Sequence, residues 1–516
     1  MVELAIEGDQ SGSVRAVFDE TYATLSEPEQ RAFRLLSLVP GPSFTTDVAA
    51  AMIEAPRWEA EQVVRGLATA HLIDEQSFGR YTFHDLVRAF GLDRARRAGD
   101  GPHAATERLL GHYLHRAVAA AQMVSPERIR LPRPAFLGPV DTVPFADRQE
   151  ALDWLSEERH NLVAGVHHAA RYGPAASSWY LVDALRGFFW LNSPSVEWLG
   201  CAQAALAAAR QHGAADGEAA VSLGIAQLLL HHDRHEESLQ AYLECLTAMR
   251  AAGWIVGEAT ALSHIGNVHM HAGRLGTARD MQQQALDISL RQGLDRTEAF
   301  SLHALGRIEC YAGDLTHARE LVERSYVLCD DIGDRYGAIY ALIDLAMIET
   351  ELGRHQEAFV TLRRGFQQAA ELGPPVLKVR CRSMLAHIHR SLGRDDEAAV
   401  HYERAVELAR GINVKVHEAE AVIGLAAVTA NRGDLAQATR HAETAMSICH
   451  RSGFGLLEAD THAVLAEIHS LGGSPGQSAD HHGTALSMYE QSGYLLGRTR
   501  LLRMPHAANQ LPAAIG

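Results

Sequence analysis

The sequence predicts an all-α protein, built mainly from helical hairpins that repeat every forty residues and preceded by a small domain of different character. Three observations support this prediction. Glycine recurs at one fixed interval, alanine recurs in phase with it, and the stretches between the glycines have the apolar spacing of helices. The chain has 516 residues, too many for one ordinary hydrophobic core, so an array of repeated units is expected.

Glycine sets the period of the repeat. One series of glycines falls forty residues apart, at Gly273, Gly313, Gly353, Gly393, Gly433 and Gly473. A second series, shifted by twenty residues, comprises Gly253, Gly293, Gly333, Gly373, Gly453 and Gly493. Asn413 stands where the second series lacks a glycine, and asparagine is a frequent substitute for glycine at a left-handed helix cap. Each of these positions is therefore expected to end one helix and open the turn to the next.

Small side chains recur in phase with the glycines, as close packing of neighbouring helices requires. Alanine follows the first glycine series by five residues and recurs seven residues later, at Ala278, Ala318, Ala358, Ala398 and Ala438, and at Ala285, Ala405, Ala445 and Ala485. A leucine or isoleucine followed by a small residue marks each first helix, at Ile265-Gly266, Leu305-Gly306, Leu345-Ala346, Leu385-Ala386, Leu425-Ala426 and Leu465-Ala466. This combination resembles the tetratricopeptide repeat in a longer form of about forty residues. The repeats cover roughly 215–500, with Asp233 at the turn position one period before Gly273.

The resemblance implies a superhelix of stacked hairpins, with a concave face lined by the first helix of each hairpin. Mapping the repeat pattern onto the chain gives a set of predicted ligand-binding residues on this face: Asn267, Met270, His271, Phe300, His303, Arg307, Tyr311, Tyr340, Met347, Glu351, Arg380, His387 and Arg390. Thr260, Ser263, Ile343 and Ser383 are expected on the same face. Such a mixed polar and aromatic lining suits a peptide, a protein or a small molecule.

The region before the repeats predicts three helices and a β-hairpin. SEPEQ, which begins at Ser26, is a helix start, and that helix stops at Pro40-Gly41-Pro42. Further helices are expected to begin at Thr45 or Thr46 and at Pro56. The strand-like segments LIDEQ and RYTFHD flank a turn at Ser77-Phe78-Gly79. Three helices and a two-stranded wing predict a winged-helix domain over residues 13–98.

The segments LLSLVPGPSFT, AHLIDE and RYTFHDLVRAF resemble the winged-helix domain of STAND-class signalling ATPases, in the AfsR-like regulators of actinobacteria. In these regulators the domain follows an NB-ARC nucleotide-binding core and precedes tetratricopeptide repeats. Residues 145–170 resemble the helical join between the two. The sequence contains no G-x-x-x-x-G-K-[ST] motif, so the chain is expected to lack the P-loop core and not to hydrolyse ATP alone. Whether it is part of a longer regulator or a protein without such a core is left open.

His84 and Asp85 match the MHD-type motif of that family, with Phe83 as its hydrophobic residue. The resemblance implies that His84 contacts an ADP phosphate if a nucleotide-binding core is supplied, in the same chain or in trans. A catalytic His-Asp dyad is disfavoured, because adjacent residues on a strand point to opposite faces. Asp85 is instead expected to cap the following helix.

The predicted domain organisation has five parts: a flexible N-terminus (1–12), the winged-helix domain (13–98), a helical connector (99–214), the repeat array (215–500) and a flexible tail (501–516). The connector contains divergent repeats and a proline-rich loop at 123–144. A solvated linker explains this loop, and an arm that docks on a neighbouring domain is the alternative.

Composition argues against several functional classes. The net charge of −16, with Lys378 and Lys415 as the two lysines, makes direct nucleic-acid binding unlikely. The third helix of the winged-helix domain also carries two acidic residues, Glu59 and Glu61, beside its arginines, so it has no basic cluster. No stretch is apolar enough for a membrane helix, and the N-terminus lacks a signal peptide, so a cytoplasmic protein is predicted. Six scattered cysteines predict buried, reduced thiols.

Histidine is abundant, with 29 residues, so clusters arise by chance. The candidate metal ligands are His231, His232 and His235 with Asp233, then His264, His269 and His271, and the pair His387 and His389. Inter-helix turns and packing positions explain them, so no metal and no cofactor is expected. His269 and His389, in phase with Glu309, Glu349 and His469, predict hydrogen bonding between helices.

Three hypotheses for function follow. The first is the ligand- or protein-binding sensor and scaffold of a STAND-type regulator, whose partner is a protein, a peptide or a small-molecule effector. The alternative is an enzyme of specialised metabolism, with a pocket built from His271, His303, Tyr311, Glu351 and His387, although no catalytic motif assigns their roles. The third is an oligomerisation arm without a small ligand. The oligomeric state is left open.

Overall fold

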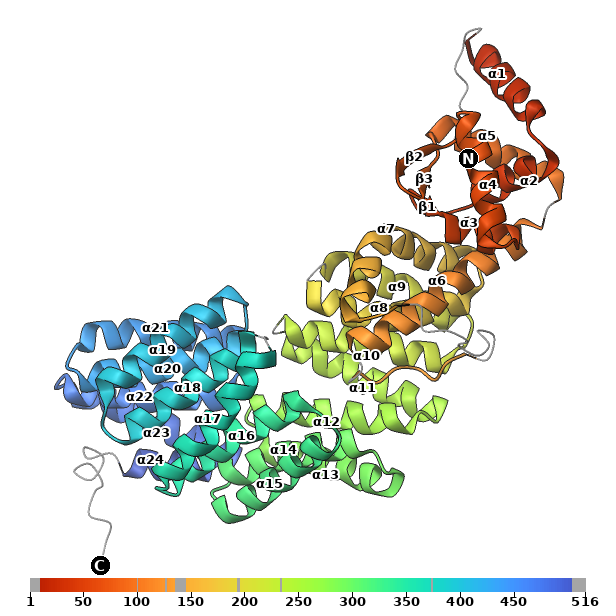
Figure 1. The fold of residues 1–516 in the computed structure, drawn as a ribbon. Coiled ribbons are helices and arrows are strands. Elements are labelled where there is room, and N and C mark those ends of the chain that lie inside the picture. The colour runs from red at the N-terminus through yellow and green to blue at the C-terminus, as the bar shows by residue number, and fades with distance from the viewer. Residues whose placement is uncertain are drawn as a thin grey trace, which may run out of the picture. The chain divides into compact units, whose positions relative to one another are not determined.

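The computed structural model describes residues 10–99, 101–125, 128–134, 145–192, 195–232, 234–372 and 375–503. Over these residues the chain forms twenty-four helices and three short strands (Figure 1). The all-α fold class expected from the sequence is confirmed. The chain divides into two compact units, residues 1–225 and 226–516, which are described in turn.

The first unit opens with the N-terminal bundle, residues 10–98. Its helices are α1 (Gln10–Thr24), α2 (Glu27–Leu36), α3 (Thr46–Ile53), α4 (Arg57–Thr69) and α5 (Asp85–Ala98). Its sheet has the antiparallel order β1-β3-β2, from the strands β1 (Phe44–Thr45), β2 (Asp74–Ser77) and β3 (Arg80–Thr82). The expected hairpin of β2 and β3 is present. The third strand, β1, was not predicted, because its two residues give no alternation for a sequence pattern to detect.

The helix starts of the bundle follow the expected side-chain chemistry. The backbone N–H and the hydroxyl of Ser26 donate to Glu29 Oε2 at 2.8 and 2.6 Å, and the hydroxyl of Thr45 accepts from Val48 N at 3.3 Å. The expected cap at Asp85 is wrong. The N-cap of α5 is His84, which makes no side-chain capping bond, and Asp85 is the first helical residue. The carboxylate of Asp85 therefore acts only through its favourable charge at the helix N-terminus.

The rest of the first unit is a helical layer built from α6 (Pro102–Val124), α7 (Arg148–Tyr172), α8 (Ala175–Asn192) and α9 (Ser195–Gln211), with the first part of α10 (Ala215–His231). Part of the proline-rich loop, residues 128–134, lies against α8. Leu131 N donates to Asp183 Oδ2 at 2.9 Å, and the guanidinium of Arg186 donates to the Ile129 carbonyl. Asp183 and Arg186 are both buried, so this part of the loop is docked and is not a solvated linker.

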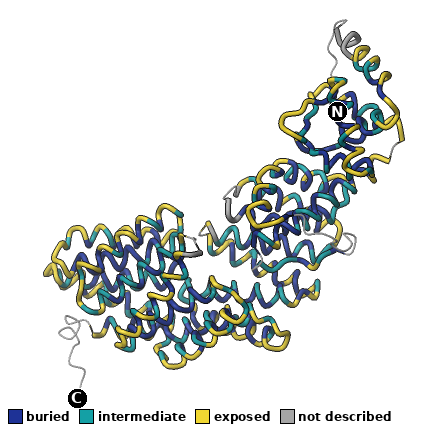
Figure 2. The backbone as a smooth tube through the Cα atoms, in the orientation of Figure 1, coloured by how far each residue is buried: buried dark blue, intermediate teal, exposed yellow. Residues whose placement is uncertain are grey.

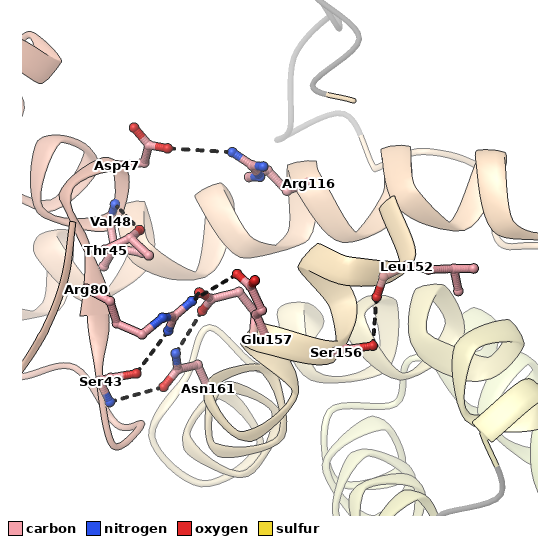
Figure 3. A network of polar contacts seen from close by, with 11 residues as sticks. Ser43, Thr45, Asp47, Val48, Arg80, Arg116, Leu152, Ser156, Glu157 and Asn161 are labelled. Carbon is pink, nitrogen blue, oxygen red and sulfur yellow. Dashed lines mark hydrogen bonds and ion pairs between the residues drawn. The ribbon is translucent and has the colours of Figure 1, made fainter. Parts of the chain in front are cut away.

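A buried polar network ties the turn end of the β2–β3 hairpin to α7 (Figure 3). The Arg80 guanidinium contacts Glu158 and donates to Ser43 Oγ at 3.0 Å. Asn161 Nδ2 donates to the other oxygen of Glu158 at 2.7 Å. Asn161 Oδ1 in turn accepts from Ser43 N at 3.4 Å. Every polar atom of the Glu158 and Asn161 side chains thus has a partner, which suits residues that are each 1% exposed.

The second unit continues through α11 (His235–Ala252) into six helical hairpins and a final short helix, which together form the repeat array. The hairpins are α12 (Ile255–His271) with α13 (Leu275–Gln292), α14 (Asp295–Tyr311) with α15 (Leu315–Asp331), α16 (Arg335–Glu351) with α17 (His355–Leu372), α18 (Pro375–Ser391) with α19 (Asp395–Gly411), α20 (Lys415–Asn431) with α21 (Leu435–Ser452), and α22 (Gly455–Leu471) with α23 (Pro475–Ser492). The final helix is α24 (Leu495–Leu502). The first helices begin forty residues apart, as the glycine spacing predicts.

The turn and packing positions also follow the predicted phases. The described glycines of both series have positive φ, and Asn413 has a φ of 54°, so it takes the left-handed conformation that its series requires. Gly373 and Asp233 lie outside the described residues. All the alanines of the two predicted series are buried. Gly306 shows how tightly neighbouring helices approach, because a Cβ there would lie 2.4 Å from Val322 Cγ2.

The first helices, α12 to α22, contact one another in succession and form the inner layer of the array, and the second helices cover them. Figure 2 shows buried residues concentrated where neighbouring helices face each other. None of the described helices combines the length and the apolar character that crossing a membrane requires. All six cysteines are free and buried, as expected.

The repeat array closes on itself, a feature that the repeat pattern did not predict. Helix α22 contacts α12, and α24 contacts α14. A Cβ on Gly455, the first residue of α22, would lie 2.7 Å from the carbonyl oxygen of Ala272, at the end of α12. One apolar cluster accordingly joins the two ends of the array, since it contains Met270 and Ile308 together with Leu456 and Tyr494.

Candidate ligand-binding site

The closed array contains an inner cavity of about 190 Å³. Side chains of α14, α16, α18, α20, α22 and α24 line it, with Tyr402 of α19 and Tyr494. Five of the thirteen residues predicted for the concave face lie in its lining: Arg307, Tyr311, Met347, Arg380 and His387. Ile343 and Ser383, which were expected on the same face, also line it. Part of the mapped face thus lines a cavity.

Asp344 is the centre of the first ion cluster at this cavity. It is 2% exposed and accepts from Arg380 Nη2 at 2.6 Å. His303 Nε2 lies 2.7 Å from its other oxygen, and Arg307 Nε lies 3.6 Å from it. Burial alone would raise the pKa of Asp344, but Arg380 and His303 outweigh it and hold the pKa well below the usual range. The Arg380 guanidinium also lies over the Tyr340 ring, 4.6 Å from its centroid.

Glu351 is the centre of a second cluster, which attaches α24 to the array. His387 Nε2 lies 3.1 Å from Glu351 Oε1, and Arg500 Nε donates to Oε2 at 3.2 Å. Burial would raise the pKa of Glu351, but the hydrogen bond to His387 and the charge of Arg500 lower it to about 2. The rings of Tyr311 and Tyr494 add an edge contact at 5.0 Å. Both clusters are internally paired and leave little free capacity.

Two further carboxylates at the cavity each have only one oxygen in a hydrogen bond. Glu420 Oε2 lies 2.8 Å from His417 Nδ1, and Asp460 Oδ1 accepts from the Tyr489 hydroxyl at 2.7 Å. Within the described residues the second oxygen of each carboxylate has no hydrogen-bond donor. Burial would raise the pKa of Glu420, but His417, with the more distant Arg380 and Arg307, lowers it to about 2. Burial raises the pKa of Asp460, and the Tyr489 hydrogen bond and the charges of Arg500 and Arg390 offset this only in part.

Two other lining residues carry buried donors. Among the described residues, Ser383 Oγ and Arg307 Nε are buried without a hydrogen-bond partner, and both residues line the cavity. Arg307 Nε lies 3.6 Å from Asp344 Oδ2, and the other end of the guanidinium donates to the Tyr311 hydroxyl at 3.0 Å. The lining therefore combines carboxylates on α20 and α22 that keep an oxygen without a donor with residues on α14 and α18 that keep a buried donor.

The remaining predicted residues lie around or away from the cavity. His303 and Tyr340 lie behind the lining, where they contact Asp344 and Arg380 respectively. Glu351 likewise contacts the lining residue His387. Asn267 accepts from Gln282 Nε2 at 3.3 Å within its own hairpin, and Met270 is part of the apolar cluster at the closure.

His271, Phe300 and Arg390 complete the predicted set. The ring of His271 faces Phe454 at 6.2 Å, and burial lowers its pKa to about 3. Phe300 is exposed and lies beside His264, with ring centroids 5.7 Å apart. Arg390 is half-buried, one turn beyond His387, and makes no ion pair within the described part of the chain. The five residues of the enzyme alternative are therefore not gathered at one point.

Glu420, Asp460 and Arg500 were missed, although the sequence contained a signal for them. The concave face was mapped over four hairpins only. Continuing the forty-residue phase of Tyr340 and Arg380 leads directly to Glu420, Asp460 and Arg500. The same position in five successive repeats, from Tyr340 to Arg500, therefore supplies a residue at or beside the cavity.

The residues in phase with His269 contact neighbouring side chains, but the predicted hydrogen bonding is found only in part, because His389 Nδ1 has no hydrogen-bond partner within the described residues. His269 accepts from Arg274 at 2.8 Å, and Glu309 binds Arg279 at 2.8 Å. The ring of His389 stacks on that of His401 at 5.6 Å, and His469 stacks on His481 at 5.4 Å. Over the described ranges no three His, Cys, Asp or Glu side chains are grouped so as to hold a metal ion. Asp233 and the side chain of His231 lie outside those ranges.

His84, the predicted nucleotide contact, is exposed at the N-terminus of α5. Its side chain has no hydrogen-bond partner within the described residues. Phe83, the preceding residue, packs its ring against those of Phe33 and Phe44, each 5.7 Å away. The aromatic core thus fixes the backbone before His84 and leaves the imidazole open to solvent.

Residues 257–329 and 338–411 match the family model of the tetratricopeptide repeat. The regulatory protein AfsR of Streptomyces coelicolor is 36% identical over 171 residues, which are 32% of this chain and 17% of that protein. AfsR of Streptomyces griseus is 30% identical over 213 residues, 40% of this chain and 22% of that protein. The chain thus spans about a fifth of the length of these curated relatives.

A crystal structure extends the comparison along the chain. A signal transduction ATPase with numerous domains (STAND) from Pyrococcus horikoshii, described as having a tetratricopeptide-repeat sensor, has a TM-score of 0.55 and 14% identity. The alignment covers 94% of this chain and 67% of that protein, and at this identity the likeness concerns the fold alone. With the repeat geometry above, these findings identify the second unit as a tetratricopeptide-repeat superhelix, in a chain partly similar to AfsR.

Proposed function

We propose that this chain is the effector-sensing part of a STAND-type regulator similar to AfsR. In this proposal the repeat array binds the effector, and the N-terminal bundle acts as a winged-helix domain that relays binding to a nucleotide-binding core in the same chain or in trans. The observation that supports it most is the charged inner cavity, whose carboxylates on α20 and α22 keep free oxygens.

A purely structural role explains such an interior poorly. Replacing buried ion pairs with well-packed apolar residues is often neutral or stabilising, so stability alone does not favour charges here. An unpaired polar atom costs further free energy, about 1–3 kcal/mol each. Ser383 Oγ and Arg307 Nε are such atoms. A ligand that pairs with them would recover this cost, which is the arrangement expected of a binding site.

The relay has a physical connection within the first unit. Arg80 of β3 is bound to Glu158 of α7, and His84 follows Arg80 by four residues. A shift of α7 would therefore move the strand that leads to His84. By its resemblance to the MHD-type motif, we assign His84 as the residue that reaches the ADP phosphate when a nucleotide-binding core is present.

The proposed division of labour keeps the sequence boundaries: the winged-helix domain over 13–98, the connector over 99–214 and the sensing array over 215–500. The proposed partners are the nucleotide-binding core and an effector that is a small molecule, a peptide or a protein. Nucleic acid is not proposed as a direct partner, because the chain has a net charge of −16.

Two measurements test the proposal. The first is a thermal-shift screen of the purified chain against small metabolites and peptides, in which an effector raises the Tm of the wild type and raises that of Glu420→Gln less. The second measures ADP retention when the chain is combined with the NB-ARC core of an AfsR-like protein. His84→Ala should accelerate ADP release, while His103→Ala, which alters another exposed histidine, should not. Failure of every compound to bind, together with unchanged ADP release, would contradict the proposal.

A further inference from the structure

We infer that the inner cavity takes a compact molecule bearing both an ammonium and a carboxylate group, the chemistry of a free amino acid. This inference deepens the proposed sensor function and rests on it. It follows from the size of the cavity, its balance of charge, and the position of its unused polar atoms.

The volume indicates the size of the ligand first. The cavity measures about 190 Å³, whereas drug-sized ligands occupy sites of about 300–1,000 Å³. A molecule of amino-acid size therefore suits the cavity better than a peptide chain.

The acidic side of the cavity suits an ammonium group. Glu420 on α20 and Asp460 on α22 occupy the same repeat phase on neighbouring inner helices, and each offers one oxygen without a donor among the described residues. Tyr402 and Tyr494 line the adjoining wall. The raised pKa of Asp460 fits this assignment, because an ammonium would supply the positive charge that its surroundings lack.

A second pair of lining residues suits a carboxylate. Arg307 Nε on α14 and Ser383 Oγ on α18 are buried donors without a hydrogen bond in the described structure. The Arg307 guanidinium is held in place by the Tyr311 hydroxyl at 3.0 Å, so it is already oriented before a ligand arrives. A carboxylate beside Arg307 would gain a charge-assisted hydrogen bond from the guanidinium.

The balance of charge argues for a ligand with both groups. Arg307, Arg380 and Arg500 face Asp344 and Glu420 in the lining and Glu351 beside it, three cations against three carboxylates, with Asp460 as a fourth acid of raised pKa. A simple anion would leave an uncompensated charge beside these groups, which is costly, and a simple cation would leave the donors on α14 and α18 unused. A zwitterion brings one charge of each sign and so can pair with both sets of groups.

The test is calorimetric titration of the full chain with the twenty common L-amino acids as probes. For each that binds, the carboxylic acid without the amino group and the amine without the carboxylate are titrated as matched analogues. We expect at least one amino acid to bind with 1:1 stoichiometry, and each analogue to bind at least about tenfold weaker. Glu420→Gln and Asp460→Asn should each weaken binding about tenfold or more, whereas Glu443→Gln, on the exposed side of α21, should leave it unchanged.

Circular dichroism of each variant establishes that the array is folded. No binding at millimolar amino acid, equal binding of the analogues, or full binding by folded Glu420→Gln would each overturn the inference. Its failure is distinguishable from failure of the sensor function: if another metabolite or a peptide binds the array while zwitterions do not, the sensor role stands and the amino-acid ligand class is wrong.

Discussion

Two sets of charged residues in this protein are paired differently. At the turn end of the β2–β3 hairpin, Glu158 binds Arg80 with one oxygen and Asn161 with the other. Inside the repeat array, Glu420 and Asp460 each leave an oxygen without a donor among the described residues. The residue types are the same, but only the first set is fully satisfied. The comparison teaches that complete pairing marks a structural joint, and that incomplete pairing beside a cavity marks a candidate site.

The largest effect is expected at the structural joint. Glu158→Ala leaves Arg80 buried without its anion, so it should reduce the free energy of unfolding of the first unit by about 3–5 kcal/mol. Five of the six tryptophans precede residue 226, so tryptophan fluorescence during urea unfolding reports mainly on this unit. The control is Glu157→Ala. Glu157 has a side chain 69% exposed and lies 3.8 Å from the same arginine, so its loss should cost no more than about 0.5 kcal/mol. Equal losses of stability in Glu158→Ala and Glu157→Ala would mean that the buried pair is not a structural joint.

The next effect is expected where the array closes. Gly455→Ala places a methyl group against the Ala272 carbonyl, 2.7 Å away, and should cost about 1–3 kcal/mol of stability in the second unit. Gly476→Ala is the control, because a Cβ there meets no other atom within 4 Å. Alanine at 476 should be neutral or stabilising by up to about 1 kcal/mol. Urea unfolding followed by circular dichroism measures both, and a harmless Gly455→Ala would argue against the closure.

The ion cluster of α24 gives a smaller, pH-dependent effect. Arg500→Gln removes a cation from Glu351, and because Arg500 is partly exposed the loss should be about 1 kcal/mol at neutral pH. The pKa of Glu351 is lowered from 4.5 to about 2, so the ionised form is favoured in the folded state. Its contribution is complete above pH 4.5 and is lost as the pH falls towards 2. The stability difference between wild type and Arg500→Gln should therefore narrow over that window, and a constant difference would count against the pairing.

The smallest stability effect is expected at Asp460 of the candidate site. Asp460→Asn keeps the shape of the side chain and an acceptor for the Tyr489 hydroxyl. Burial already raises the pKa of Asp460, so removing its charge should change the free energy of unfolding by no more than about 1 kcal/mol. The same urea titration as for Gly455→Ala measures it. A loss as large as that at Glu158 would mean that Asp460 serves the structure, and the distinction between the two sets of charges would fail.

Local patterns in the sequence predict the repeat well, because a positive φ at the glycines and at Asn413 and small residues at Ala278 and its equivalents are requirements of each hairpin alone. The contact between Gly455 and Ala272 is different. It results from a small rotation added at each hairpin, and no single repeat encodes that sum. The side chains that pair with the residues of the concave face could not be predicted for the same reason, because they come from other hairpins.

The candidate site could be predicted in part. Arg307 and Arg380 follow from the repeat phase, and so would Glu420 and Asp460 had the mapping continued to the last hairpin. Which of them stay unpaired depends on side-chain geometry across the cavity, between residues more than a hundred positions apart in the sequence. The two-residue strand β1 was missed because it is stabilised by pairing with β3 and not by its own pattern.

The closure of the array around its cavity is the central structural claim, and one cross-link tests it directly. A Cβ at residue 273 would lie 3.6 Å from Ser492 Cβ, within the range of about 3.5–4.5 Å found in disulfides. Under mild oxidation, the double variant Gly273→Cys with Ser492→Cys should form a disulfide within one chain, identified by mass spectrometry of the joined peptides. The pair Gly273→Cys with Gly476→Cys should not. Because Gly273 has a positive φ, circular dichroism first establishes that the double variant is folded. If the folded variant fails to cross-link, or forms cross-links only between chains, the array is open and the closure is contradicted.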